Sequence, residues 1–425
     1  MEKREMSPDY FSAPGSALLR IANPFLIVVA GIACAASGHS QTPIPGFSPG
    51  GRMQLLQTDL AVLESREPWR DLPCVVTTLK PVLGFDFMFH TGYEVEVPIR
   101  ELTGGGNELT VFFRVVAQDR PDDPSNIVQN VPVPPLEERV RGEGTFYGTF
   151  TLGEGKYHVD WLVRDQRMRT CSMSWDLDTK LNSKDRRLRQ WIPHSLVRLL
   201  GPLFAAEPPV LRAPDNGSPR FSIVVNFDPS DPSAALIDER GLEGLLAILR
   251  RMGRDPRIEP YSIIVCSLET QQVIYQQENK SGIDLPALGV ALASAKLGTV
   301  DAKRLVATNG PAQFAADLIQ EQLRKEDSDA LIVLGPKGGS ETRISRQTLE
   351  SFDQLGKPAF YLSYATGQVS AWRDPVSSIM KHLRGFEYRI DRPKDFFNAW
   401  SEVVTRIVQA KQTPRSSIAA TVTTR

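Results

Sequence analysis

The chain has 425 residues, and its 49 basic and 50 acidic residues give a formal net charge of −1, which excludes the strongly basic class of nucleic-acid-binding proteins. With 41% hydrophobic and 23% charged residues, the composition is that of a globular protein, and the length predicts two or three domains. Four cysteines and five histidines show no metal-ligand spacing, so we expect neither a metal centre nor a cofactor.

An uncharged apolar run, PFLIVVAGIACAA, occupies residues 24–36 and is followed by small and polar residues. Its length is typical of the core of a secretory signal peptide, whereas a membrane-spanning helix needs about 20 apolar residues. We therefore expect residues 1–40 to be a cleaved signal peptide, with an uncleaved membrane anchor or lipidation of Cys34 as alternatives. Either way, the sequence predicts an exported protein of the periplasm, cell envelope or extracellular space.

Export would place the cysteines where thiols can oxidise. Cys74 and Cys171 lie near the two ends of one predicted domain, and we expect them to form a disulfide. The alternative is that both are unpaired buried thiols, since spacing alone does not establish connectivity. Cys266 lies inside the apolar run YSIIVCSL and is predicted to be a buried core thiol.

Residues 41–69 form a predicted linker with a short helix, and residues 70–180 then alternate with the period of two that is typical of strands. The predicted strands are FDFMFH (85–90), YEVEVPI (93–99), LTVFFRVV (109–116), TFYGTFTL (145–152) and KYHVDWLVRD (156–165). Several short strands at this spacing predict an antiparallel β-sandwich of immunoglobulin-like size.

Two further features of this domain carry expectations. The proline-rich segment 120–135 is expected to be a surface loop or an edge crossing, since proline cannot donate to a central strand ladder. His90 and His158 could in principle form a metal pair, but no third ligand follows at a usable spacing. We expect them to be half-exposed strand residues.

Residues 181–220 form a predicted linker that is basic at first and rich in proline later. It carries seven basic and three acidic residues, whereas residues 70–180 carry 12 basic and 17 acidic residues. The sequence therefore predicts that the basic linker packs against the acidic β domain.

From residue 221 to residue 410, strands alternate with helices. The predicted strands are FSIVVNF (221–227), YSIIVCSL (261–268), QVIYQQ (272–277), ALIVLG (330–335) and PAFYLSY (358–364). Predicted helices lie between or after them, at 242–252, 284–296, 311–325 and 394–408. This order predicts an open, mostly parallel sheet flanked by helices, with one antiparallel edge strand. The final segment, 411–425, is expected to be a disordered tail.

The order of these elements, with the motif NFDPSDPS after the first strand, resembles the A domain of von Willebrand factor and integrins (VWA domain). That family carries a metal-ion-dependent adhesion site, with DxSxS after the first strand, a threonine in a later loop and an aspartate after the fourth strand. In this chain Asp228 and Ser230 match the motif, Pro232 replaces the second serine, and Ser233 comes one residue late. Thr299 could stand for the loop threonine.

Where the second aspartate of the family should be, this chain has GPKGGS with Lys337. An ammonium group beside Asp228 would replace a divalent cation electrostatically and would repel one. We therefore expect a metal-free site with a Lys337–Asp228 contact, in which Asp228, Ser230, Ser233, Thr299 and Lys337 bind a protein partner. The alternative is that DPSDPS is a turn with a capping aspartate.

The expected function is binding or assembly at the cell envelope through the VWA-like domain, without enzymatic activity. The motifs GxxxxGK[ST], GxGxxG and GxSxG are absent, which argues against common nucleotide-binding and hydrolase sites. The alternative is an envelope hydrolase or carbohydrate-active protein with a site between the domains. The whole chain also resembles an uncharacterised family of bacterial exported two-domain proteins, from which no activity can be transferred.

Overall fold

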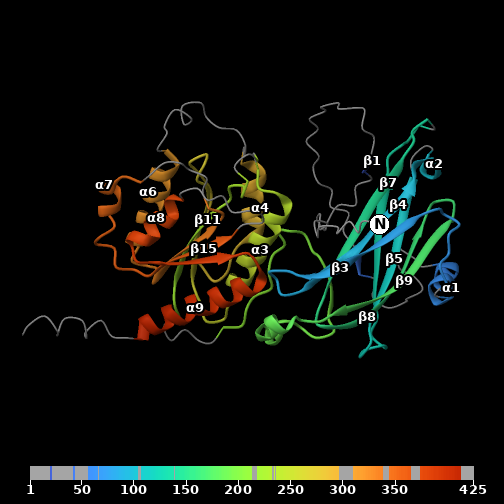
Figure 1. Cartoon of the computed structure of the whole chain (residues 1–425), viewed down its shortest axis with the longest axis horizontal. Coiled ribbons are helices and arrows are strands. Elements are labelled where there is room, and N and C mark those ends of the chain that lie inside the picture. Colours follow the sequence, from blue (N-terminus) through green and yellow to red (C-terminus); the bar gives the residue numbers. More distant parts are fainter. Residues whose placement is uncertain are drawn as a thin grey trace, which may run out of the picture. The chain divides into compact units, whose positions relative to one another are not determined.

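The structure is a computed structural model, and it describes residues 20–21, 42–43, 56–65, 67–103, 107–137, 139–212, 218–231, 234, 236–295, 310–337, 344–364 and 374–412. The chain divides into two compact units, Met1–Pro202 and Leu203–Arg425 (Figure 1). The first unit consists of antiparallel sheets, and the second contains a mixed sheet with helices. The protein therefore combines β and α/β architecture, as the sequence predicts.

The first unit contains two antiparallel sheets. One has the order β1-β7-β4-β3 with β10 also paired to β7, and the other has the order β2-β6-β5-β8-β9. The first sheet comprises β1 (Arg20–Ile21), β3 (Val75–Leu83), β4 (Phe89–Pro98), β7 (Glu143–Leu152) and β10 (Val197–Leu199). The second comprises β2 (Thr42–Pro43), β5 (Asn107–Ala117), β6 (Ser125–Val133), β8 (Gly155–Arg164) and β9 (Thr170–Thr179).

An aromatic core joins these two sheets face to face. In β4, Tyr93, Val95 and Val97 are fully buried, and their side chains alternate with those of two glutamates as a half-buried strand requires. The Tyr93 ring lies 5.6 Å from the ring of Phe113 on β5 and 5.3 Å from that of Trp161 on β8. The Tyr93 hydroxyl donates to Gln129 Oε1 at 2.9 Å. These contacts across the sheets define a β-sandwich core.

A short helix, α1 (Gln57–Ser65), packs against the outer face of the second sheet. Leu63 of this helix contacts a small cluster formed by Phe112, Val128 and Leu162. Asp59 caps the helix start by accepting from the backbone N–H of Leu56, and it also pairs with Arg164. The described residues of this unit also form the four-residue helix α2 (Ile99–Leu102) and a 3-10 helix.

Two expectations for the strands of this unit are wrong. Residues 85–88 of the segment FDFMFH form a turn rather than a strand, with Phe87 in the left-handed region at φ 61°, and β4 starts at Phe89. The proline-rich segment contains a regular strand, β6, whose register with β5 runs from Ser125 to Val133. The edge of β6 that faces away from β5 pairs with β2, and among the described residues this pairing involves Ile127 and Val128. Pro132 lies outside that paired stretch, so its lack of an N–H group is tolerated there.

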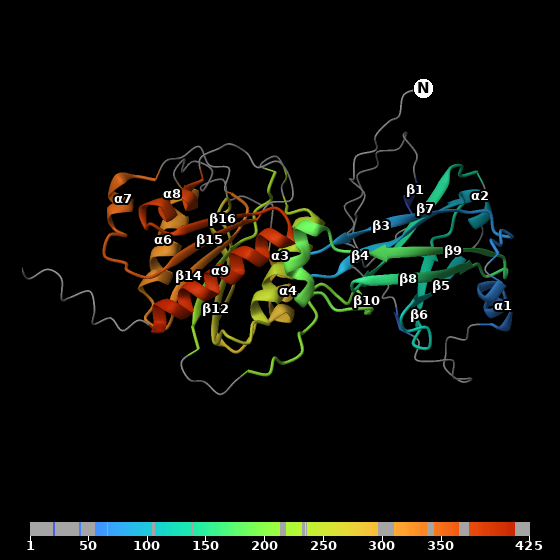
Figure 2. The ribbon, with the colours of Figure 1, turned by 60° about the horizontal axis from the view of Figure 1, so that its bottom comes forward.

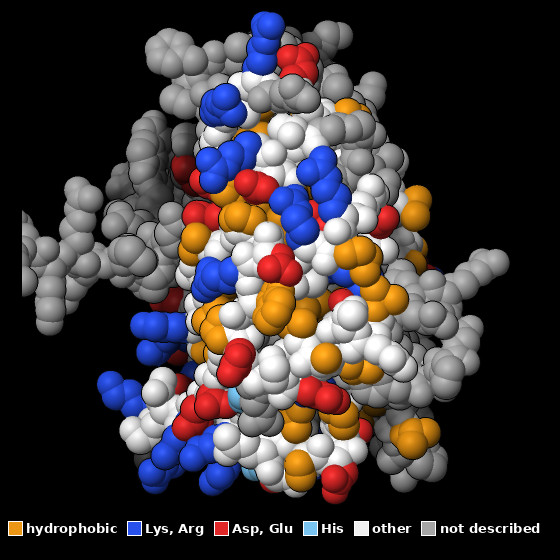
Figure 3. Space-filling view, turned by 90° about the vertical axis from the view of Figure 1, so that its right-hand side faces the viewer, with side chains coloured by type: hydrophobic (Ala, Val, Ile, Leu, Met, Phe, Trp, Pro, Cys, Tyr) orange, Lys and Arg blue, Asp and Glu red, His pale blue; other side chains and the backbone are white. Residues whose placement is uncertain are grey.

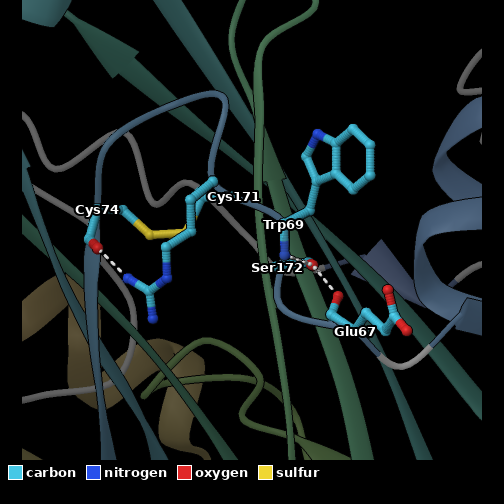
Figure 4. Close-up of a disulfide and its surroundings, with 6 residues drawn as sticks. Glu67, Trp69, Cys74, Cys171 and Ser172 are labelled. Carbon is cyan, nitrogen blue, oxygen red and sulfur yellow. Dashed lines mark hydrogen bonds between the residues drawn. A yellow bond between two sulfur atoms is a disulfide. The ribbon is translucent and has the colours of Figure 1, made fainter.

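The expected disulfide is present between Cys74 and Cys171, whose Cα atoms are 6.4 Å apart (Figure 4). It joins the chain just before β3 to β9, so it links the edge strands of the two sheets. The adjoining segment hydrogen-bonds to the start of β9, since Leu72 N donates to Thr170 O and Ser172 N donates to Trp69 O, both at 2.9 Å. The bridge therefore fastens an extension of the second sheet.

Part of the predicted linker at 181–220 has regular structure. Its first part contains a 3-10 helix (Ser183–Trp191) and β10, which pairs with β7 and belongs to the sandwich. Among the described residues, the contacts between this segment and the acidic domain include the Arg189–Glu154 ion pair at 3.1 Å. On the face drawn in Figure 3, basic, acidic and hydrophobic side chains are interspersed, without one dominant sign of charge.

The second unit is built on a six-stranded sheet with the order β13-β12-β11-β14-β15-β16. All neighbouring pairs are parallel except β12 and β13, which form a hairpin at one edge. The strands are β11 (Phe221–Asn226), β12 (Tyr261–Ser267), β13 (Gln272–Lys280), β14 (Ala330–Gly335), β15 (Ala359–Tyr364) and β16 (Phe386–Ile390). The apolar runs of β11, β12, β14 and β15 are buried along their whole length, which is typical of sheets covered on both faces.

Helices cover both faces of this sheet. On one face, α6 and α8 pack against a core that includes Val224, Cys266 and Tyr361. The other face is covered by α3 and α9 (Figure 2). There the ring of Trp400 in α9 lies 5.8 Å from the ring of Phe221, and the Tyr261 hydroxyl donates to the Met252 carbonyl of α3. In the described part of this unit, the helices are α3 (Glu239–Gly253), α4 (Leu285–Ser294), α6 (Gly310–Arg324), α7 (Arg346–Glu350), α8 (Pro375–His382) and α9 (Pro393–Gln412).

Aspartate side chains begin three of these helices. Asp238, Asp284 and Asp374 accept hydrogen bonds from backbone N–H groups in the first turns of α3, α4 and α8. Such caps satisfy donors that have no partner within the helix. They fix where each helix starts after its loop.

The expectations for the two ends of the chain fall largely outside the described residues. The apolar run at 24–36 and the segment 413–425 are not described, and α9 extends to Gln412, beyond the predicted end of the domain. None of the helices in the described ranges combines the length and the apolar character needed to cross a membrane.

Candidate functional site

The candidate site lies at the carboxyl-terminal ends of the central parallel strands. Asp228 and Ser230 follow β11, Glu269 follows β12, and Lys337 follows β14. Because β11, β12 and β14 are parallel neighbours, these residues leave the same edge of the sheet. We call this set of four residues the strand-end face. Open α/β sheets commonly bind ligands at this edge.

Asp228 is buried, with 8% of its surface exposed, and its carboxylate binds protein donors. Its Oδ1 accepts from the hydroxyl of Ser267 at 2.5 Å. Its Oδ2 accepts from the backbone N–H groups of Leu268 and Glu269, both at 3.0 Å. Asp228 therefore fixes the turn that follows β12, rather than pointing at solvent.

Asn226, the last residue of β11, connects the ends of three strands. Its Oδ1 accepts from the N–H of Asp228 at 3.2 Å, and its Nδ2 donates to the carbonyl of Pro336, just after β14, at 3.5 Å. Gly335 lies against it with φ at +140°, and a Cβ atom there would come within 2.5 Å of the Asn226 carbonyl oxygen. This close approach requires glycine at the end of β14.

Two acidic groups make this edge electrostatically unfavourable for negative charge. Burial raises the pKa of Asp228 above its ordinary value, and the hydrogen bonds from Ser267 and the backbone only partly offset that rise. The pKa of Glu269 is also raised, first by partial burial and then by the charge of Asp228. A cationic group arriving at Glu269 would relieve this repulsion.

The expected contact between Lys337 and Asp228 is wrong. The Lys337 ammonium pairs instead with Glu387 on β16, at 2.5 Å. The Lys337 side chain therefore contacts the edge strand β16 rather than Asp228. Ser230 is half-buried near Asp228 in the chain, whereas Ser233 and Thr299 lie outside the described residues.

The described residues of this edge do not fit a divalent cation of the adhesion-site kind. A cation needs several free carboxylate or hydroxyl oxygens, and both oxygens of Asp228 already accept from protein donors. Across the described ranges, no group of three His, Cys, Asp or Glu side chains is placed to hold a metal ion. Asp228 acts here as an internal hydrogen-bond acceptor.

The histidines of the sandwich make ion-pair contacts that a structural role explains. His90 lies 3.0 Å from Asp86, and His158 lies 2.7 Å from Asp176 and 3.1 Å from Asp160. As expected, both are strand residues of intermediate exposure.

A serine, a histidine and an aspartate also meet in this unit, after the 3-10 helix. Ser195 Oγ donates to Asp119 Oδ2 at 2.7 Å and lies 2.8 Å from Nδ1 of His194. A catalytic serine must give its proton to the histidine and must be reachable by substrate. Here the proton goes to the carboxylate, and Ser195 is 5% exposed, so the group stabilises a turn.

Sequence reasoning did not single out Asn226, Ser267 or Glu269. Two of them were visible as polar residues that end apolar runs, in FSIVVN and YSIIVCS. A polar side chain at the last position of a buried strand is a usable indication of a site.

Comparison with known proteins gives little to add to this geometry. No protein-family model matches the chain, and no curated protein matches it. Among solved structures, a lipoprotein from Bacteroides thetaiotaomicron has 10% identity, covering 27% of this chain and 85% of that chain, with a TM-score of 0.15. A β-glucuronidase from Bacteroides uniformis has 10% identity over 75% of this chain and 45% of that chain, with a TM-score of 0.16. Similarities at this level carry no conclusion about fold or activity.

Proposed function

We propose that the protein is an exported cell-envelope binding protein, whose VWA-like α/β unit binds a protein partner at the strand-end face without a divalent cation. The supporting observation is that protein donors hydrogen-bond to both oxygens of the Asp228 carboxylate. Three protein donors occupy it, so the edge is organised by hydrogen bonds where an adhesion site would use a metal ion. The mostly parallel sheet with one antiparallel edge strand agrees with the VWA resemblance.

Export is supported by the apolar run at 24–36 and by the disulfide between Cys74 and Cys171, because such bridges persist in oxidising compartments. The partner chemistry follows from the charge at the strand-end face. Glu269 is exposed and carries a raised pKa beside a buried carboxylate, so a lysine or arginine of the partner would be attracted to it.

The test uses the full chain as bait for envelope extracts, with captured proteins compared between variants. Glu269→Gln removes the exposed charge but keeps the backbone N–H that binds Asp228. Glu321→Gln, on the exposed side of α6, is the matched control. We expect capture to fall at least about tenfold with Glu269→Gln, in line with the loss of a charge pair at an interface, and to be unchanged with Glu321→Gln.

Capture should be the same in EDTA and in magnesium. If EDTA abolished capture, the metal-free site would be refuted, and equal capture by wild type and Glu269→Gln would remove the strand-end face as the binding surface.

A further inference from the structure

A pocket of about 510 Å³ opens in the α/β unit, at the amino-terminal edge of the sheet. Its walls are the chain segment at 207–212, the carboxyl-terminal end of α3, and the segment 281–285 that joins β13 to α4. Since Glu259 lies just before β12 and Ser281 just after its antiparallel neighbour β13, the pocket is at the sheet edge opposite the strand-end face. Its volume is within the range of small-molecule sites.

Two arginines at the carboxyl-terminal end of α3 bind one carboxylate in this pocket. Arg250 and Arg254 are one helical turn apart, and their side chains lie on the same helix face. Glu207 places its Oε1 3.0 Å from Arg250 Nε and its Oε2 3.0 Å from Arg254 Nη1. The pocket wall therefore already binds a carboxylate group, which is supplied by the chain itself.

A third arginine faces the same space from the segment 207–212. Arg212 Nη2 donates to the carbonyl of Gly253 at 3.0 Å, and its Nε lies 3.4 Å from Glu259. The bond to Gly253 places a positive charge at the negative end of the α3 dipole, where it offsets part of the repulsion that an anion would meet. The Glu259 carboxylate, at 3.4 Å from one arginine, is held less closely than the Glu207 carboxylate, which lies 3.0 Å from each of two arginines.

The side chains that line the pocket carry an excess of positive charge, which favours the binding of a further anion. Three arginines oppose the two glutamates Glu207 and Glu259, so the lining has one positive charge in excess. A guanidinium group has five N–H donors, and Glu207 takes one of those of Arg254, whose side chain is 41% exposed. Val210, Ile283 and Leu285 supply an apolar wall beside these donors.

We propose that this pocket binds a small molecule that carries a carboxylate group, with Arg254 and Arg212 holding the carboxylate and the apolar wall holding its carbon skeleton. The planar guanidinium fork matches a carboxylate in two-point geometry. Glu207 then acts as an internal competitor, because it uses the same arginine face as the ligand.

The test measures binding of succinate, citrate and benzoate to the full chain by calorimetry, with succinamide as the uncharged control and inorganic phosphate as the other oxyanion. We expect at least one carboxylate to bind, succinamide not to bind, and Arg254→Gln to weaken binding at least about tenfold. Glu207→Gln should strengthen binding, because it removes the competing charge. Arg346→Gln, on the exposed face of α7 with 93% exposure, is the matched control and should bind as the wild type does.

A second measurement follows the backbone amides of Ser281 and Gly282 by NMR, where the bound ligand should shift the resonances in proportion to occupancy. No binding of any carboxylate at millimolar concentration would overturn the proposal, as would equal loss with Arg254→Gln and Arg346→Gln. Phosphate binding as tight as that of the carboxylates would overturn the assignment of the ligand class. Because the pocket and the strand-end face use different residues, Glu269→Gln should leave carboxylate binding unchanged, so the two proposals fail separately.

Discussion

Replacing Asp228 with alanine tests whether this residue organises the strand ends. The change leaves the Ser267 hydroxyl and the N–H groups of Leu268 and Glu269 without their acceptor. A buried donor without a partner costs about 1–3 kcal/mol. The N–H of Glu269 is partly exposed and can bind water, so two donors carry most of the loss, which we put at about 3 kcal/mol.

Thermal and urea unfolding of the full chain measure this loss. For a unit of this size, 1 kcal/mol lowers Tm by about 2–4 °C, so the transition of the α/β unit should fall by about 6–12 °C. Asp228→Asn is the matched variant, because its amide oxygen can still accept the two N–H groups while its NH₂ faces Ser267. It should stay within about 1 kcal/mol of wild type.

The stability of wild type relative to Asp228→Asn should depend on pH, and the direction of this dependence follows from the pKa shift of Asp228. Burial raises the pKa of Asp228 above 3.8, so folding favours the protonated carboxyl. The stabilisation is complete below the pKa of the unfolded chain and is lost as the pH rises through the folded pKa. As the pH rises above about 4, wild type should therefore lose stability relative to Asp228→Asn. A loss below about 1 kcal/mol for Asp228→Ala, or a pH profile identical to that of Asp228→Asn, would refute the reasoning.

Three further predictions concern other parts of the molecule. Replacing Cys74 and Cys171 by serine should destabilise the β unit by about 2–5 kcal/mol in urea unfolding, and an unchanged midpoint would show that the bridge adds nothing. Gly335→Ala should cost about 1–3 kcal/mol for its φ of +140° alone, whereas Gly356→Ala, with no atom within 4 Å of the added Cβ, should keep the Tm of wild type. EDTA and magnesium should both leave Tm within error in a scanning fluorimetry series, and a rise of several degrees with magnesium would contradict a metal-free site.

The central strands could be predicted because burial on both faces produces continuous apolar runs. FSIVVN, YSIIVCS, ALIVLG and AFYLSY are of this kind, and all four are buried along their length. The edge strand β16, FEYRI, has no such run because it is mostly exposed, and it was missed. The position of this edge strand depends on its pairing with β15, which a single sequence does not reveal.

That omission explains the wrong partner for Lys337. The sequence places Lys337 and Asp228 at the ends of neighbouring strands, which is correct. The acceptor that Lys337 binds, Glu387, belongs to the missed strand β16. The placement of Asp228 and Lys337 at neighbouring strand ends could therefore be predicted, whereas their contacts depended on an element that left no clear pattern in the sequence.

Proline content misled the prediction for β6 in a similar way. The segment 120–135 was judged by its prolines, but the strand Ser125–Val133 includes only Pro132 among them. Its core-facing residues, such as Ile127 and Val131, carry the ordinary pattern of a buried strand. The position of a proline relative to the paired edge, rather than the number of prolines, decides whether a strand can form.

The buried thiol of Cys266 makes the α/β unit observable on its own. Burial raises the pKa of this thiol far above its usual value, so it reacts slowly with alkylating reagents while the sheet is closed. Cys74 and Cys171 are bonded to each other and do not compete for the reagent. In a chain with Cys34→Ser, the alkylation rate would report how often the central sheet opens, while the sandwich contributes no background. The opening of the α/β unit could thus be timed in the full chain, without separating the two units.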